Sequence, residues 1–321
     1  MKKNELLGEF ALIKIIKKIT GKPSKDVVAG IGDDAAVLNY DKNNYMLIAT
    51  DIIVEKRHFT LKYWDPCQIG MLAIEKNVSD IAAMGGIPKF AVVSVALPSY
   101  ADSKFVEKLY EGIKKSAGRY KIEIVGGDMS SSNEIAVNVA MIGFVGKKFL
   151  ALRSGAKTGD LIFCSADVGK SAAGLELLRK NKNGKSAKRH LHPKSRLDLA
   201  RKLVKIGISS MIDVSDGVSS GVRNICEESK VGAVIYAGKI PISEDTARDS
   251  KKTGKDAIDL ALYGGEDFEL VFTAGENKLN KLKKLGVVVI GEIVSKKHGI
   301  KLARNGKTEN LKGGFDHFRK K

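Results

Sequence analysis

The chain has 321 residues, of which 43% are hydrophobic and 29% are charged, and its formal net charge at pH 7 is +18. This composition is typical of a globular protein with well-formed cores and excludes a wholly disordered chain. No apolar run approaches the roughly 20 residues of a membrane-spanning helix, and no cleavage site follows the basic N-terminus, so we expect a cytoplasmic protein.

The positive charge comes mainly from lysines spread along the whole chain, for example Lys17-Lys18 and Lys283-Lys284. This spread favours a solvated, lysine-rich surface, with an RNA-binding protein that uses the charge as the alternative. No basic motif with interleaved aromatic residues indicates a specific nucleic-acid partner. Reduced thiols, and neither disulfides nor a zinc site, are expected at the three scattered cysteines, which are Cys67, Cys164 and Cys226.

The first half of the chain alternates helical patterns with short apolar runs. An amphipathic helix is expected within residues 1–19, and strands are expected at 45–50, 90–97, 122–127 and 135–145. The segments 66–86 and 102–120 have helical spacing and capping residues. These elements predict an α/β or α+β domain that spans residues 1–147.

A second domain is expected over residues 148–321. A turn and a strand at 153–166 precede helical stretches at 169–180 and 194–207. Residues 181–195 are polar, basic and weakly patterned, which predicts an exposed loop. A helix is expected after MIDVSDG (211–217), and ALYGGEDFELVFTA (261–274) is typical of a turn followed by a strand.

Two kinds of phosphate-binding loop can be tested directly. GIGDDA at 30–35 fits GxGxxA, but its two carboxylates would repel a pyrophosphate at that turn. The GKS sequences at 169–171 and 184–186 lack the first glycine of a Walker A loop, because Cys164 and Arg179 stand there. Any nucleotide phosphate is therefore expected to bind without a P-loop.

Acidic residues recur where apolar runs end. They are Asp33, Asp34, Asp51, Asp128, Asp213, Asp216, Glu266 and Asp267. Residues at strand ends gather at one edge of an α/β sheet, and Asp80 joins them from a helix face that it shares with Asn77. One such aspartate alone is more often a cap or a turn residue. Together they would repel one another unless cations lay between them, which predicts a nucleotide site with several Mg²⁺ ions.

Nine motifs then occur in a fixed order along nearly the whole chain. They are GIGDDAAVL (30–38), TDIIVEKRHF (50–59), NVSDIAAMGGIP (77–88), GGDMSSS (126–132), RSGAKTGD (153–160), GKSAAGL (169–175), MIDVSDG, GGEDFELVFT (264–273) and GGFDHF (313–318). The series resembles the thiamine-monophosphate kinase family, within the aminoimidazole ribonucleotide synthetase-like ATP-binding superfamily. This resemblance implies a two-domain α/β (α+β) fold, a homodimer formed through the N-terminal sheet, and ATP and thiamine monophosphate as substrates.

The resemblance also implies roles for individual residues. The expected Mg²⁺ ligands are Asp34, Thr50, Asp51, Asp80, Asp128, Asp213 and Asp216. The expected ATP contacts are Gly127, Asp128, Arg153, Ser215 and, more weakly, Tyr110. His58, Glu266 and Phe315 would lie around the thiamine phosphate. The acceptor oxygen of a phosphate monoester is already anionic at neutral pH, so direct, metal-assisted transfer without a general base is expected.

Several positions depart from the family pattern or leave a choice open. Ala49 stands where a hydroxyl residue is usual, so a ligand to one secondary metal is expected to be missing. Lys170 replaces an acidic residue, and Phe315 replaces Tyr or Trp. Asp33 either orients Asp34 or contacts a metal through water.

A different enzyme of the same superfamily is the remaining enzymatic alternative. GGEDFEL and GGFDHF favour thiamine phosphate as the acceptor. The first 66 residues contain no cysteine, whereas selenophosphate synthetases usually have a reactive Cys or Sec near the N-terminus.

Overall fold

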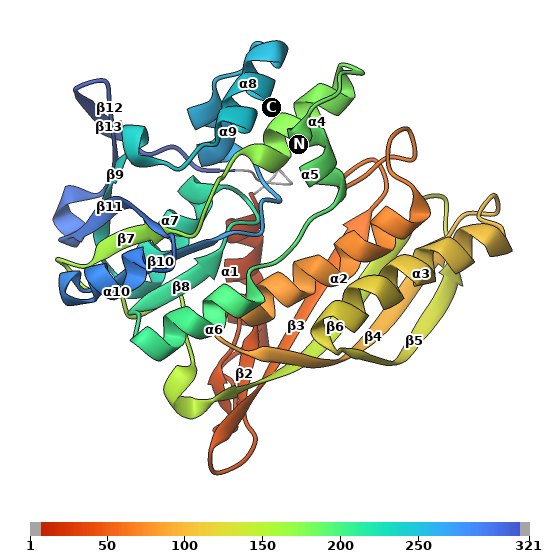
Figure 1. The fold of residues 1–321 in the computed structure, drawn as a ribbon. Helices are drawn as coiled ribbons and strands as arrows, with labels where there is room; N and C mark the ends of the chain where they lie inside the picture. Colours follow the sequence, from red (N-terminus) through yellow and green to blue (C-terminus); the bar gives the residue numbers. More distant parts are fainter. Residues whose placement is uncertain (1–7, 315–321) are drawn as a thin grey trace, which may run out of the picture.

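The computed structural model describes residues 8–314 and contains two mixed β-sheets with helices packed against them (Figure 1). The strands of the first sheet are β1 (Val27–Ala29), β2 (Ala36–Asn39), β3 (Asn44–Val54), β4 (Ile87–Leu97), β5 (Glu123–Ser131) and β6 (Ala136–Gly146), in the order β1-β2-β3-β6-β4-β5. The helices of this half are α1 (Glu9–Thr20), α2 (Pro66–Ala83) and α3 (Ser103–Tyr120).

The second half of the chain forms a seven-stranded sheet with the order β13-β12-β9-β11-β7-β10-β8. Its strands are β7 (Leu161–Cys164), β8 (Ser210–Asp213), β9 (Gly232–Tyr236), β10 (Leu270–Ala274), β11 (Val288–Val294), β12 (Ile300–Arg304) and β13 (Lys307–Asn310). Its α-helices are α4 (Lys170–Arg179), α5 (Lys185–Leu191), α6 (Leu197–Ile206), α7 (Val218–Ser229), α8 (Glu244–Thr253), α9 (Ala257–Tyr263) and α10 (Leu279–Lys283). Short 3₁₀ turns are η1 (Lys147–Phe149), η2 (Ala237–Lys239), η3 (Glu276–Lys278) and η4 (Lys296–His298).

The predicted division at residues 147 and 148 stays a prediction, and both residues fall in η1, between the two sheets. The expected α/β or α+β architecture is confirmed, with every predicted strand and most predicted helices in place. The predicted loop at 181–195 is wrong, because 185–191 forms the helix α5. A buried carboxylate of Asp249 accepts the N–H of Ser186 at 3.0 Å in the first turn of this helix, and α5 packs on α4 and α8. This stabilisation comes from residues distant in sequence.

The expectation that the acidic residues follow strand ends is also wrong for four of them. Glu266 and Asp267 follow the helix α9 and precede β10. Asp51 and Asp128 lie inside strands, because β3 stays paired with β6 as far as Val54 and β5 stays paired with β4 as far as Ser131. Asp213, in contrast, is the last residue of β8. For an aspartate inside a strand, the face of the sheet on which its side chain lies therefore decides which acidic side chains it can meet.

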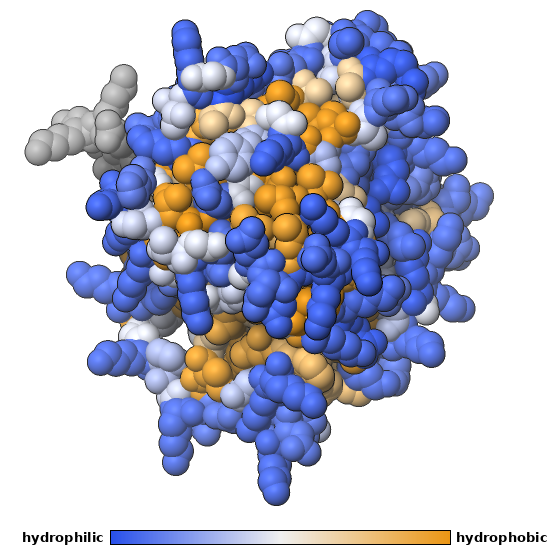
Figure 2. All heavy atoms as spheres, turned by 60° about the vertical axis from the view of Figure 1, so that its left-hand side comes forward, coloured by the Kyte–Doolittle hydropathy of each residue, from blue (hydrophilic) through white to orange (hydrophobic). Residues whose placement is uncertain are grey.

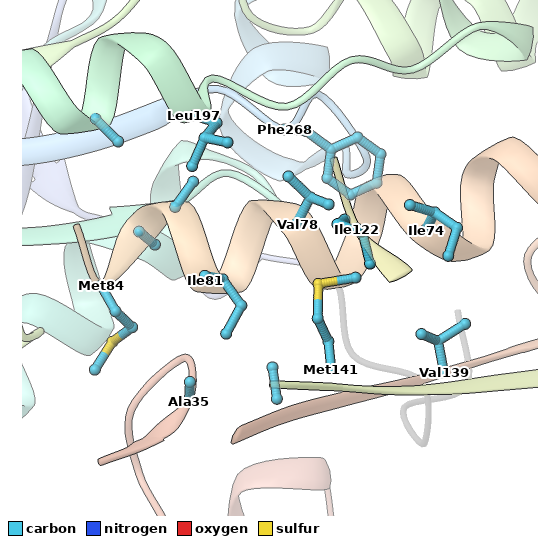
Figure 3. Close-up of a cluster of buried hydrophobic side chains, with 14 of the residues drawn as sticks. Ala35, Ile74, Val78, Ile81, Met84, Ile122, Val139, Met141, Leu197 and Phe268 are labelled. Carbon is cyan, nitrogen blue, oxygen red and sulfur yellow. The ribbon is translucent and has the colours of Figure 1, made fainter. Parts of the chain in front are cut away.

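Helix α2 lies at the centre of the molecule. It begins with a capping box, in which Asp65 accepts the N–H of Gln68 and the Gln68 side chain accepts the N–H of Asp65, and Pro66 follows in the first turn. Figure 3 shows Ile81 of α2 facing Met141 of β6, while Phe268 and Leu197 from the second half lie on the other side of the helix. One hydrophobic core therefore joins both halves around α2.

Hydrophilic side chains cover most of the face in Figure 2, around smaller apolar areas, as expected for a lysine-rich surface. The first sheet differs, because α2 and α3 cover only one of its faces (Figure 1) and apolar residues such as Ile52 and Val92 are exposed on the other. No helix within residues 8–314 is long and apolar enough to cross a membrane. The three cysteines are free thiols, as predicted.

Candidate active site

Three aspartates from distant parts of the sequence meet between the two sheets. Asp34 follows β1, Asp80 lies in the last turn of α2 and Asp213 ends β8. One carboxylate oxygen from each lies within 4.8 Å of the others. We call these three residues the acidic cluster. All three are metal ligands predicted from the sequence, and the fold brings them together because α2 and β8 are in contact.

The acidic cluster carries more negative charge than its protein neighbours compensate. Burial raises the pKa of Asp34 and of Asp80, and the charges of Asp51 and of the other cluster members raise the pKa of Asp80 further. The pKa of Asp213 is about 7, chiefly because of burial and then because of Asp34, although Ser79 donates a hydrogen bond to its Oδ2 at 2.7 Å. The Oδ2 atom of Asp34 is buried and has no hydrogen-bond partner. Buried carboxylate oxygens without donors fit a hard divalent cation such as Mg²⁺.

Arg153 compensates part of this charge, and Asp33 holds the backbone around the ion pair. The guanidinium Nη2 of Arg153 lies 2.5 Å from Asp34 Oδ1, and the backbone N–H of Arg153 donates to Asp33 Oδ2 at 3.1 Å. Asp33 Oδ1 also accepts the N–H of Asp34 at 3.0 Å. Asp33 therefore fixes the backbone on both sides of the ion pair, which supports its orienting role, and burial together with Asp34 raises its pKa to about 7.

The turn in GGEDFEL presents Glu266 toward this site. Glu266 and Phe268 have positive φ angles of 64° and 51°, which are uncommon for residues other than glycine. The turn is held in place because Glu266 donates its N–H to Ser215 O at 2.7 Å and Phe268 donates its N–H to Val214 O at 3.0 Å. Burial raises the pKa of Glu266 to about 7, and Asp216 and Asp51 are among the charges that act on it. The strained backbone thus places a carboxylate beside two predicted metal ligands.

The next two acidic residues of this motif have structural roles. Asp267 accepts the N–H groups of Gly169 and Ser171, at 2.5 and 2.9 Å, and so caps the start of α4. Glu269 is fully buried and contacts the Lys170 ammonium, the Arg196 guanidinium and the Ser165 hydroxyl. These four residues, the Glu269 cluster, explain how Lys170 is accommodated where an acidic residue is common.

Two predicted ligands lie on the other face of the first sheet. Side chains alternate along β3, so Thr50 is exposed and donates to Asn138 Oδ1 at 3.1 Å while Asp51 faces α2. Asp128 pairs with Ser94, which pairs with Asn138, so Asp128 also belongs to the exposed face. Neither residue is part of the acidic cluster in one chain, and their role as ligands stays a prediction.

The remaining predicted residues are placed as follows. Gly127 is required by the close pairing of β5 and β4, since a Cβ there would lie 2.0 Å from Val93 O. Tyr110 packs half-buried against the core from α3. Nδ1 of His58 accepts the N–H of Val54 at 3.0 Å. Phe315 lies outside the described residues. Contacts of these residues with substrate stay predictions.

Lys76 is not among the site residues predicted from the sequence, and it lies one helical turn before Asp80 on α2. Its Nζ is 3.6 Å from Asp51 Oδ1, and its side chain is only 11% exposed. The available signal was its i, i+4 spacing to Asp80, which puts both side chains on one helix face. Charged residues on helices are usually solvated, so this spacing alone does not reveal a buried lysine.

Both halves of the chain are similar to known proteins. The N-terminal and C-terminal domains of AIR synthase related protein match residues 32–145 and 157–302. Thiamine-monophosphate kinase of Aquifex aeolicus is 36% identical over 97% of this chain and 98% of its own length, and that of Bacillus subtilis is 35% identical over 98% and 100%. The solved structure "AaThiL complexed with AMPPCP and TMP" superimposes with a TM-score of 0.87 at 35% identity and covers 99% of both chains.

The similarity spans both sheets and the motifs that form the acidic cluster and the Glu266 turn. The chain belongs to the thiamine-monophosphate kinase family.

Proposed function

We propose that this protein phosphorylates thiamine monophosphate with ATP, giving thiamine diphosphate and ADP. An oxygen of the acceptor phosphate attacks the γ-phosphorus in line, and the bond from that phosphorus to the β,γ-bridging oxygen breaks, so ADP leaves with the bonding electrons. Family membership supports the substrates, and the acidic cluster with its unpartnered Asp34 oxygen is the observation that supports the chemistry.

The residues of the chain would bring two polyanions together. Asp34, Asp80 and Asp213 would hold Mg²⁺, with Asp51 and Asp216 close by. When bound, Mg²⁺ neutralises and orients phosphate oxygens. Arg153 is the fixed cation beside Asp34, and Glu266 would orient the acceptor. A side-chain general base is unnecessary because the acceptor oxygen is anionic at neutral pH.

The test is to incubate the purified protein with ATP, Mg²⁺ and thiamine monophosphate and to quantify thiamine diphosphate and ADP by chromatography. We expect equimolar products that EDTA abolishes. Thiamine in place of the phosphate, and a reaction without acceptor, are the controls. ATP binding without thiamine diphosphate would refute the acceptor assignment and direct the search to other acceptors of the superfamily.

We also propose that two copies of the chain pair through the exposed face of the first sheet. Ile52 and Val92 are 51% and 41% exposed on that face, and β5 is exposed along its whole length. Apolar residues grouped on an uncovered sheet face are typical of a protein interface. Val92→Lys should shift the protein from dimer to monomer in analytical ultracentrifugation. Ile19→Lys, at an exposed apolar residue of α1, should not.

A further inference from the structure

Lys76 places a fixed positive charge at one edge of the proposed metal site. Its Nζ lies 3.6 Å from Asp51 Oδ1, and its charge also acts on Glu266, Asp80 and Asp216. These carboxylates come from β3, α2 and two turns of the second half, so Lys76 lies where both halves contribute to the site. Its side chain is 11% exposed, which leaves little water to solvate the ammonium.

The other buried cations of this region are engaged differently. Arg153 contacts Asp34 directly at 2.5 Å, and Lys170 makes direct contact with Glu269. The 3.6 Å separation between Lys76 and Asp51 exceeds an ordinary hydrogen bond. Lys76 is thus shared among several carboxylates and is not committed to one structural pair.

Ala49 on β3 supports the same inference. Ala49 is buried, and it lies two residues before Asp51, on the same face of the strand. Its methyl group brings no oxygen to the face of β3 that carries Asp51. A divalent ion beside Asp51 would therefore have fewer ligands and would face the repulsion of a unit positive charge.

We propose that Lys76 takes the charge-neutralising role of one divalent cation at the edge formed by Asp51 and Glu266. This inference rests on the proposed function, in which that edge lies between the metal ligands and the acceptor. A lysine ammonium is a compact point charge with three donors, so it can neutralise phosphate oxygens there as well as carboxylates. Its charge lowers the affinity of the adjacent carboxylates for Mg²⁺.

The experiment counts Mg²⁺ bound to the full chain without nucleotide, by equilibrium dialysis and isothermal titration calorimetry. Lys76→Met should bind one additional Mg²⁺ per chain or bind Mg²⁺ at least about tenfold more tightly than the wild type, because a repelling charge has been removed. Lys76→Gln removes the charge but keeps a hydrogen-bond donor, and it should show the same gain in Mg²⁺ binding. It replaces Lys76→Met in the test if that variant folds poorly. Lys76→Arg keeps the charge and should match the wild type.

A second readout separates this role from a structural one. In EDTA, Lys76→Met should unfold at a lower temperature than the wild type, and Mg²⁺ should raise its melting temperature by more than it raises that of the wild type. If Lys76 had only a structural role, its removal would lower the melting temperature equally in EDTA and in Mg²⁺. Lys89→Met removes the same charge from an exposed lysine beside Glu123 and is the matched control.

The outcomes distinguish this inference from the proposed function. Identical Mg²⁺ binding by the wild type, Lys76→Met and Lys76→Gln overturns the inference alone. Absence of Mg²⁺ binding by the wild type and by both variants overturns the metal assignment as well.

Discussion

The acidic cluster and the Glu269 cluster both bury carboxylates, yet only in the Glu269 cluster do neighbouring cations neutralise the negative charge. Glu269 has Arg196 Nη2 at 2.6 Å, Arg196 Nε at 2.7 Å and the Lys170 ammonium, and the charge of Lys170 and the bonds from Arg196 outweigh burial and lower its pKa. In the acidic cluster, burial and mutual repulsion raise the pKa of the aspartates, and Asp34 keeps an unpartnered oxygen. A buried carboxylate with its cations is structural, whereas a surplus of buried negative charge indicates that a ligand supplies the balance.

Asp80→Asn should have the largest effect, and it should change turnover without lowering stability. We expect turnover to fall at least about 100-fold, because a ligand to the phosphate-neutralising cation is lost. In EDTA, however, the free energy of unfolding should stay unchanged or rise, since the substitution relieves repulsion from Asp51 and Asp213. Steady-state kinetics and urea unfolding would measure both. Wild-type turnover in this variant would refute the metal assignment.

Glu269→Gln should have the opposite pattern. Removing this carboxylate leaves Lys170 and Arg196 without their partner and should lower the free energy of unfolding by about 3–5 kcal/mol. The stabilisation by Mg²⁺ should remain, because the acidic cluster is untouched. Urea unfolding with and without Mg²⁺ is the measurement, and loss of the Mg²⁺ effect would mean that the two clusters are coupled.

The pH dependence of stability should also differ between the clusters. The lowered pKa of Glu269 gives stability that is present above its unfolded value of 4.5 and is lost as the pH falls below it. The raised pKa values of Asp33 and Asp213, about 7, act in the opposite sense, so in EDTA stability should decline as the pH rises from 5 to about 7.

Urea unfolding between pH 3.5 and 8 would resolve both effects. Glu269→Gln should lose only the decrease in stability below pH 4.5. Mg²⁺ should reduce the decline in stability between pH 5 and 7. A decline that Mg²⁺ does not change would contradict the assignment of the second effect to the acidic cluster.

The smallest effect is expected at the start of α2. Asp65→Ala removes the capping box, which should cost about 1 kcal/mol of stability. Asp80 lies at the opposite end of the same helix, so Mg²⁺ binding should be unaffected. Thermal unfolding and Mg²⁺ titration of the same sample would check both statements. A weakened Mg²⁺ affinity would show that the whole helix positions the site.

The sequence predicts much of the site because its motifs combine acidic residues with apolar runs and glycines. Asp34, Asp80 and Asp213 were identified in this way, and the fold brings them together. The face on which Thr50 lies was also predictable, since side chains alternate along a strand. The burial of Lys76 was not, because it depends on β3 and on the turn at 264–268 packing around α2. Helix α5 likewise depends on Asp249, 63 residues beyond Ser186.

The position of α2 between the two halves has a consequence for synthesis. Its residues 66–83 emerge early from the ribosome, but Phe268 and Phe272, which complete the same core, follow roughly 190 residues later. At 5–20 residues per second this interval lasts roughly 10–40 s. During that time the side of α2 on which Leu197 and Phe268 lie is only partly covered, so the nascent N-terminal half keeps apolar surface exposed to solvent.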